Sequence, residues 1–274
     1  MSFPSFSRPV ITLLLVLFIG TLAAQPPRGP FVVSPAVLAD KKVTFRYLAP
    51  IAREVKLSAQ FLPAPVPMVK DSIGIWSVTV GPVRPDIYPY NFIVDGISVM
   101  DPANEYFFPN ERFKASLVDV PGFTPLVHSL QEVPHGSVDY VYYPSAKGTT
   151  GTALVYTPPG YDEHSGTRYP VFYLISGTTD TEEAWYKVGH ANLILDNLIA
   201  EGKAKPMIIV MPYGNIEARV AEQTGGAKPD DPARESNEAA ERALAFEQDL
   251  VNNLVPFIDT RYRSIPGKDN RAIG

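Results

Sequence analysis

The sequence contains no cysteine, which excludes a disulfide framework, a zinc site built from thiolates and a cysteine nucleophile. Basic residues are in deficit, because 24 Lys and Arg stand against 29 Asp and Glu and give a formal charge of −5 at pH 7. This balance argues against a nucleic-acid partner. The familiar catalytic motifs G-x-S-x-G, H-E-x-x-H and the Walker glycine loop are also absent.

The composition is otherwise that of a globular protein. Hydrophobic residues make up 45% of the 274 positions, which excludes disorder along the whole chain. The length allows one large domain or two of ordinary size. The 28 prolines are about twice the ~5% average and predict many stiff, extended connections.

Residues 1–24 are typical of a secretory signal peptide. Arg8 precedes an apolar run from Val10 to Gly20, and the small residues Ala23-Ala24 follow. The run is shorter than the ~20 residues that a membrane-spanning helix needs, and no later segment is long and apolar enough to span. We expect cleavage near residue 24 and export to a bacterial periplasm or exterior, with no membrane association afterwards.

Residues 27–122 show the two-residue alternation of β-strands. Apolar and polar side chains alternate at 43–47, 55–58, 76–80 and 88–94. Roughly six or seven short strands, separated by turn residues, predict an antiparallel β-sandwich. Trp76, Tyr88 and Tyr90 could form a sugar-binding platform, but their alternation with Val and Phe favours the inward face of the sandwich.

Residues 151–274 alternate between strand and helix, after a segment over 123–150 that is predicted to be a linker or, in part, a covering strand. Strands are predicted at 152–156, 169–175, 207–212 and 271–274, and helical apolar spacing occurs at 191–199 and 238–262. Gly202 is placed to end the first helix. This order predicts a parallel sheet with crossover connections. A loop over 216–237 is too long for an ordinary crossover.

Side chains that could carry chemistry are few. The histidines lack metal-ligand spacing, and each is interpreted as a loop or surface residue: His128, His135, His164 and His190. We expect neither a metal site nor a cofactor.

An acidic segment allows two interpretations. Asp180, Glu182 and Glu183 could form a carboxylate cluster. Thr181 before two glutamates is more typical of a helix N-cap followed by an acidic first turn, so we favour the cap.

One turn is placed where catalysis could occur. Ser176-Gly177-Thr178-Thr179 follows a predicted buried strand and precedes a helix, and open α/β sheets bind ligands beyond the carboxyl ends of their strands. A glycine there lets backbone N–H groups face a developing oxyanion. The signal is weak by itself, because many strand-to-helix turns contain glycine.

Four stretches of the second half closely resemble the putative-esterase branch of the α/β-hydrolases, which includes bacterial feruloyl, acetyl-xylan and enterochelin esterases and the esterase D type. The stretches are 156–161, 169–174, 192–199 and 206–212. The first half, with 43–46, the Trp76 strand and 90–96, is similar to the early-set, immunoglobulin-like domain often fused ahead of such esterases. The resemblance implies an immunoglobulin-like sandwich, then an α/β-hydrolase domain with its oxyanion hole at Gly177 and Thr178.

Two departures from the family pattern stand out. Ser176-Gly177 occupies the place of a His-Gly pair, which puts the usual local hydrogen bonding in doubt. Residues 269–273 resemble the segment that leads into the nucleophile elbow, but the sequence ends at Gly274. The resemblance implies that the serine, acid and histidine follow in that order. We therefore expect an incomplete α/β-hydrolase domain, no catalytic triad residue within the chain, and no activity from the chain by itself.

For the complete protein, the resemblance implies a secreted serine ester hydrolase acting on a small-molecule or polysaccharide ester. Feruloyl or acetyl esters of plant cell-wall xylan are the preferred substrates, by analogy within the family. A siderophore esterase of the enterochelin type is an alternative, and so is a non-catalytic carbohydrate-binding protein that uses the early-set domain. The acyl group, the alcohol and the oligomeric state are left open.

Overall fold

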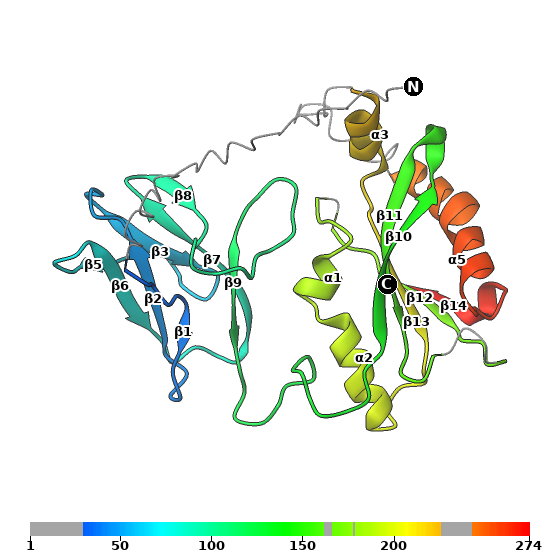
Figure 1. Ribbon diagram of the computed structural model, residues 1–274, viewed down its shortest axis with the longest axis horizontal. Helices are drawn as coiled ribbons and strands as arrows, with labels where there is room; N and C mark the ends of the chain where they lie inside the picture. Colours follow the sequence, from blue (N-terminus) through cyan, green and yellow to red (C-terminus); the bar gives the residue numbers. More distant parts are fainter. Residues whose placement is uncertain (1–29, 162–165, 178, 226–242) are drawn as a thin grey trace, which may run out of the picture. The chain divides into compact units, whose positions relative to one another are not determined.

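The computed structural model describes residues 30–161, 166–177, 179–225 and 243–274, and Figure 1 shows their strands and helices. The predicted signal peptide, His164, Thr178 and residues 226–237 of the predicted loop lie outside the described residues. No helix in the described ranges is long and apolar enough to cross a membrane.

The first nine strands form two antiparallel sheets. One sheet has the order β1-β2-β6-β5, and the other has the order β4-β3-β7-β8 with β9 also pairing with β7. The strands are β1 (Ala36–Val37), β2 (Val43–Leu48), β3 (Val55–Ala59), β4 (Val66–Pro67), β5 (Val69–Lys70), β6 (Ile75–Val80), β7 (Asp86–Val94), β8 (Ile97–Val99) and β9 (Ser116–Val120). The immunoglobulin-like assignment and the domain boundaries remain predictions.

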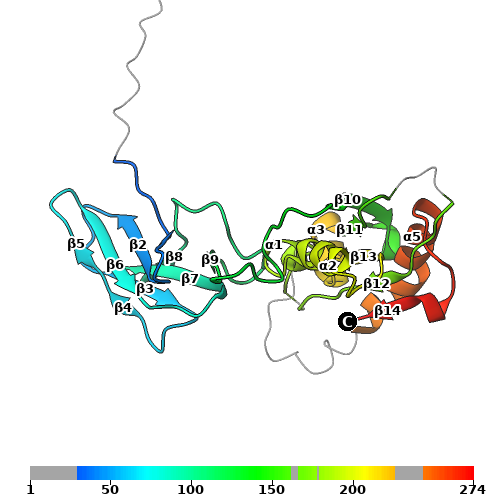
Figure 2. The same cartoon turned by 90° about the horizontal axis from the view of Figure 1, so that it is seen from below.

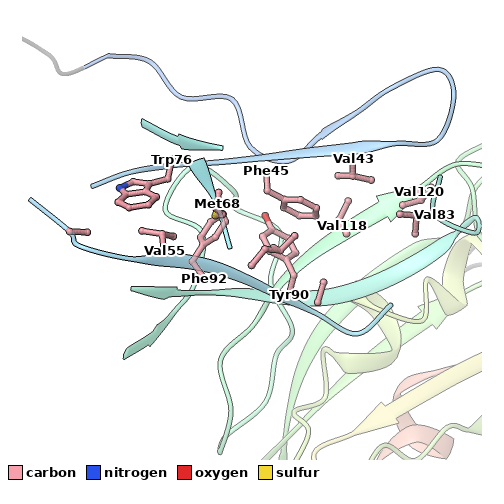
Figure 3. Packing of buried hydrophobic residues seen from close by; sticks show 13 residues of the cluster. Val43, Phe45, Val55, Met68, Trp76, Val83, Tyr90, Phe92, Val118 and Val120 are labelled. Atoms are coloured by element: carbon pink, nitrogen blue, oxygen red, sulfur yellow. The ribbon is translucent and has the colours of Figure 1, made fainter. Parts of the chain in front are cut away.

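A single apolar core lies between these two sheets. Phe45 of β2 points toward Tyr90 of β7 in Figure 3, and the two rings meet edge to face with centroids 4.7 Å apart. Trp76 is buried in the same core, and the partly buried Tyr88 packs against it. The predicted inward packing of these aromatic residues is confirmed, because alternate positions of each strand face the opposite sheet.

The last five strands form a mixed sheet of order β10-β11-β13-β12-β14. They are β10 (Ser137–Pro144), β11 (Thr150–Thr157), β12 (Val171–Tyr173), β13 (Ile208–Pro212) and β14 (Arg271–Ile273). β12 runs parallel to both β13 and β14, but β11 is antiparallel to β10 and β13. The predicted parallel sheet is therefore wrong for β11. Its almost continuous burial reflects cover on both faces and carries no information on strand direction.

Within the predicted connector over 123–150, the structure favours the covering strand over a linker for the second half. This half forms β10, which pairs with β11 along eight residues from Ser137 to Pro144, and the short 3-10 turn η1 (Ala146–Gly148). Between residues 137 and 145, only Val141, Tyr143 and Ser145 are buried. The exposed Tyr140 and Tyr142 alternate with them, and these apolar rings hide the apolar-polar alternation that would otherwise indicate a strand.

Helices cover both faces of the mixed sheet, as Figures 1 and 2 show. On one face, Leu195 of α2 (Ala191–Ala200) belongs to a cluster with side chains of β11 and β13. The π-helical turn η3 (Leu250–Leu254) and α5 (Val255–Arg261) pack on the other face. Gly202 follows α2 with φ +69 and ends it as predicted.

The remaining helical segments are short. They are α1 (Ala184–Lys187), α3 (Ile216–Thr224), the 3-10 turn η4 (Lys268–Asn270) and the helical residues 243–249 that lead into η3. The prediction of a loop from residue 216 is wrong for α3. Asn215 caps that helix by accepting a hydrogen bond from Ala218 N at 3.1 Å, a capping signal that the surrounding Gly, Pro and acidic residues obscure.

A buried carboxylate joins the β10–β11 hairpin to the helix on its face. Asp249 is 1% exposed. Its oxygens accept hydrogen bonds from Tyr143 Oη and Ser145 Oγ at 2.7 Å, and from Ala146 N and Asn253 Nδ2 at 2.8 Å. A buried charge is tolerated when it is hydrogen-bonded in this way.

Replacing Asp249 by alanine leaves these donors unsatisfied in the protein interior. We expect Asp249→Ala to lower the free energy of unfolding by about 3 kcal/mol, measured by urea denaturation. The exposed Asp269 is the control, and Asp269→Ala should change stability by no more than about 0.5 kcal/mol. Equal effects of the two substitutions would contradict the structural role of Asp249.

A second buried carboxylate holds the segment before β10 against α2. Asp196 accepts hydrogen bonds from Tyr156 Oη at 2.6 Å, Gly136 N at 3.0 Å and His135 Nδ1 at 2.9 Å. The other ring nitrogen of His135 donates to Gln131 O at 3.0 Å. The Asp196 carboxylate and the Gln131 carbonyl can only accept hydrogen bonds, so the imidazole makes both contacts when both of its nitrogens are protonated. The hydrogen bond to Asp196 therefore raises the pKa of His135 above its usual value.

This arrangement predicts a pH-dependent contribution of His135 to stability. Because its pKa is raised in the folded protein, the contribution is complete below the ordinary histidine pKa of ~6.5 and is lost as the pH rises through the raised value. The difference in unfolding free energy between the wild type and His135→Gln should therefore be larger at pH 6 than at pH 9. An equal difference at both pH values would show that the charge of His135 contributes nothing.

Candidate functional site

The turn at Ser176-Gly177 follows β12 at the carboxyl edge of the parallel strands. Tyr173 lies opposite Val210 of β13 on one side and Ile273 of β14 on the other. The pairing with β14 continues beyond the strand, because Ile175 N donates to Gly274 O at 2.7 Å. Gly274 and the turn therefore lie side by side at the edge where open α/β sheets bind ligands.

Gly177 presents backbone groups with little around them. Its carbonyl accepts a hydrogen bond from Asp180 N at 2.9 Å, and within the described part of the chain its N–H has no acceptor. A Cβ at this position would lie 3.0 Å from Oδ2 of Asp180, so the close carboxylate favours glycine. A free, exposed N–H is the kind of donor that stabilises an oxyanion. Thr178, the second predicted donor, is not among the described residues, so the oxyanion hole stays a prediction.

Ser176 lies where the resemblance to the esterases implies a histidine. Its hydroxyl oxygen is buried and has no hydrogen-bond partner among the residues that the structure describes. The neighbouring Ile175 carbonyl accepts a hydrogen bond from Trp185 Nε1 at 2.9 Å. The Ser176 side chain thus makes none of the described hydrogen bonds that hold the turn.

A loop between β8 and β9 holds the turn from the other side. Asn110 is 2% exposed, and its Nδ2 donates to Asp180 Oδ1 at 2.7 Å and to Thr179 Oγ1 at 2.9 Å. The backbone N–H of Glu111 donates to Thr179 O at 2.8 Å. Asn110 is a functional candidate that the sequence did not reveal, because no local pattern links a loop to a turn 70 residues later.

The acidic segment after the turn forms the predicted cap only in part: Thr181 Oγ1 accepts a hydrogen bond from Glu183 N at 3.4 Å, but the helix starts later than expected. α1 begins at Ala184, and its N-cap residue Glu183 makes no capping hydrogen bond with its side chain. Glu182 is instead 4% exposed, and it accepts a hydrogen bond from the hydroxyl of Tyr140. Burial raises the pKa of Glu182, because desolvation disfavours the charged carboxylate. The structure thus places a buried carboxyl group where the sequence pattern predicts the start of a helix. This burial depends on a contact with Tyr140, which is distant in sequence, so the local pattern does not reveal it.

The described histidines contact structural partners. His135 binds Asp196 as described above, His190 Nε2 lies 2.9 Å from Tyr106 Oη, and its Nδ1 lies 3.1 Å from the carbonyl of His128. Across the described ranges, no group of three or more His, Asp and Glu side chains could hold a metal ion.

The second half of the chain matches a known family. Residues 145–274 match the family model described as "Putative esterase". The matched range contains β11 to β14, the turn at Gly177 and the helices on both faces of the mixed sheet.

Among curated proteins, the chain is similar to an endo-1,4-beta-xylanase/feruloyl esterase of Xylanibacter ruminicola. The two are 31% identical over 256 residues, which cover 91% of this chain and 33% of the relative. The chain thus spans about a third of the length of that relative.

Two solved structures are similar as well. A ferulic acid esterase from Anaeromyces mucronatus is 26% identical, with a TM-score of 0.43 over 54% of this chain and 51% of that chain. The enterobactin esterase from Shigella flexneri, crystallised in the presence of enterobactin, is 15% identical, with a TM-score of 0.52 over 84% of this chain and 63% of that one.

The likeness to the Shigella structure concerns the fold. The match covers 84% of this chain, which is more than residues 145–274 alone. The shared fold therefore includes strands of the sandwich in addition to the mixed sheet. The conclusion on the family rests on the family match, the curated relative and the order of the mixed sheet: residues 145–274 of the chain belong to the putative-esterase branch of the α/β-hydrolases.

Proposed function

We propose that the full-length gene product is an exported serine ester hydrolase that acts on carbohydrate esters. The observation that carries this proposal is the turn at Gly177, whose N–H is free of acceptors in the described structure and which lies beside Gly274 at the carboxyl edge of the sheet. The nucleophilic serine is proposed to follow β14, so that an ester carbonyl bound there would reach both the serine and the Gly177 N–H.

The proposed reaction proceeds through an acyl-enzyme. The serine oxygen forms a bond to the ester carbonyl carbon while a histidine takes its proton, and the carbonyl oxygen becomes an oxyanion held by backbone N–H groups. The alcohol leaves with the proton from the histidine. Water then attacks the acyl group, the acid is released and the serine is restored. The Gly177 N–H and the N–H of Thr178 are the donors assigned to the oxyanion.

The proposed substrate is a feruloyl or acetyl ester on xylan. The support for it is the xylanase/feruloyl esterase of Xylanibacter ruminicola, which is 31% identical to the chain over 91% of its length. This aligned range includes the sandwich as well as the mixed sheet. Siderophore esters of the enterochelin type are the competing substrate class, and carbohydrate binding without catalysis is the competing function.

Covalent labelling tests the serine mechanism and the substrate together. The full-length gene product should react with a fluorophosphonate at one serine, which mass spectrometry should locate shortly after Gly274. The same protein should hydrolyse methyl ferulate or acetylated xylo-oligosaccharide at least tenfold faster than enterobactin, by kcat/KM. Absence of labelling and of hydrolysis would refute the esterase function, and a preference for enterobactin would support the siderophore alternative.

Asn110 provides a test of the turn itself, because it touches the turn and not the proposed reacting atoms. We expect Asn110→Ala to lower kcat for methyl ferulate about tenfold or more with little change in KM, since small displacements of an oxyanion donor reduce the rate strongly. The control is the exposed Asn252, where Asn252→Ala should leave kcat unchanged. A loss of stability measured by urea denaturation with no change in kcat would limit Asn110 to a structural role.

A further inference from the structure

A polar cavity of about 270 Å³ opens next to the turn. It lies where the end of β13, the edge strand β10, the start of α1, α3 and the loop between β8 and β9 come together. Its lining contains four glutamates, one arginine, two tyrosines and one threonine: Glu111, Tyr140, Thr181, Glu182, Glu183, Tyr213, Arg219 and Glu222. Neither the family match nor the similar proteins assign a role to this cavity.

The charged groups on one side of the cavity are paired with each other. Arg219 lies 3.4 Å from Glu222, donates to Thr152 Oγ1 at 2.9 Å, and has its guanidinium carbon 4.4 Å from the centre of the Tyr213 ring. Glu183 forms an ion pair at 2.9 Å with Lys187, one turn along α1. These contacts fix the arginine and neutralise two of the four carboxylates.

The two other carboxylates are held by tyrosine hydroxyls. Glu111 accepts hydrogen bonds from Tyr213 and from Asn215 Nδ2, and Glu182 accepts one from Tyr140. A carboxylate has about four acceptor positions, so both retain capacity for hydroxyl donors inside the cavity. Because one hydroxyl group both donates and accepts, a polyhydroxyl ligand could use these carboxylates together with the N–H groups of an arginine.

An aromatic surface adjoins the cavity on β10. Tyr140 and Tyr142 project from the same face of this strand, with ring centroids 5.5 Å apart. Their side chains remain 46% and 64% exposed, whereas Val141 and Tyr143, on the opposite face, are buried. Of the described side chains on this face of β10, only Val138 packs against the cluster that contains α2, which leaves the two rings open.

We propose that this cavity and the Tyr140–Tyr142 surface bind the sugar part of a carbohydrate ester, as a neutral saccharide. This inference rests on the proposed function, and it adds the place where the sugar, which is the alcohol part of the ester, would bind. The hydroxyls of the sugar bind to Glu111, Glu182 and Arg219, and its C–H face packs on the tyrosine rings. A small number of polar groups in fixed orientations, next to the apolar face of an aromatic ring, is typical of a specific site for a small ligand.

The position of the cavity fits an ester held at Gly177. Thr181 lines the cavity and lies four residues after that glycine in a turn that Asn110 keeps compact. Tyr213 directly follows β13, the strand hydrogen-bonded to β12. One end of a substrate at the turn is therefore next to the cavity, where the alcohol side of the ester bond would extend.

The charge of the cavity distinguishes the two substrate classes. Glu222 and Glu183 are paired with Arg219 and Lys187, so Glu111 and Glu182 leave the lining acidic, and an acidic lining repels an anionic ligand. A neutral pentose or hexose meets no such repulsion, whereas an iron-loaded catecholate siderophore is an anion. The cavity therefore favours a carbohydrate ester over a ferric siderophore ester.

Binding of an unesterified sugar tests the site without any need for catalysis. Isothermal titration calorimetry of the full-length gene product with xylotetraose should give a measurable dissociation constant, which Tyr142→Ala should raise about tenfold. Tyr142→Phe keeps the ring and should bind within about twofold of the wild type, because the Tyr142 hydroxyl makes no hydrogen bond among the described residues. The exposed Phe123, outside the site, is the matched aromatic control, and Phe123→Ala should also bind within about twofold.

Ester hydrolysis by the same variants separates this inference from the proposed function. Tyr142→Ala should lower the ratio of kcat/KM for a feruloylated xylo-oligosaccharide to that for methyl ferulate about tenfold, and Tyr142→Phe should restore it. Unchanged xylotetraose affinity in Tyr142→Ala, or no xylotetraose binding by a wild type that hydrolyses methyl ferulate, would overturn the saccharide site. Tyr142-dependent xylotetraose binding without hydrolysis of any ester would support the site and refute the esterase function.

Discussion

Strand β12 is only three residues long, yet the geometry of the candidate site depends on its hydrogen bonds. Val171 and Tyr173 are buried, and the strand is paired on both sides, with β13 and with β14. A shift of one residue in either ladder would turn these side chains to the opposite face. The buried side chains thus fix the register, and the register fixes where Gly177 lies relative to Gly274.

Buried polar side chains hold the neighbouring helices and loops in fixed positions relative to the sheet. Asp249 ties a helix to the β10–β11 hairpin, Asp196 ties α2 to the segment before β10, and Asn110 ties the loop before β9 to the turn. Each of these side chains bonds groups far away in sequence. A buried polar group of this kind specifies one arrangement, because any other leaves its partners without hydrogen bonds. The sandwich therefore contributes a residue to the site through one of its loops.

The sequence predicts the regular parts well, because burial leaves a periodic pattern. Alternation at 43–47 and 76–80 corresponds to β2 and β6, and the spacing at 191–199 corresponds to α2. Prediction fails where the pattern carries no such information: β11 is buried on both faces whatever its direction, and β10 is half exposed at a sheet edge. At the site, Gly177 follows from its place after a buried strand. Asn110 and the burial of Glu182 depend on contacts between distant segments that no local pattern records.

The central claim is that the Gly177 turn holds the oxyanion of an ester that reacts just beyond β14. A crystal structure of the full-length gene product, inhibited by a phosphonate ester, would test it most directly. The account predicts a covalent bond to a serine that follows β14, with the phosphonyl oxygen about 3 Å from the backbone nitrogen of Gly177. An adduct on a residue elsewhere, or a phosphonyl oxygen beyond hydrogen-bond distance of that nitrogen, would contradict it.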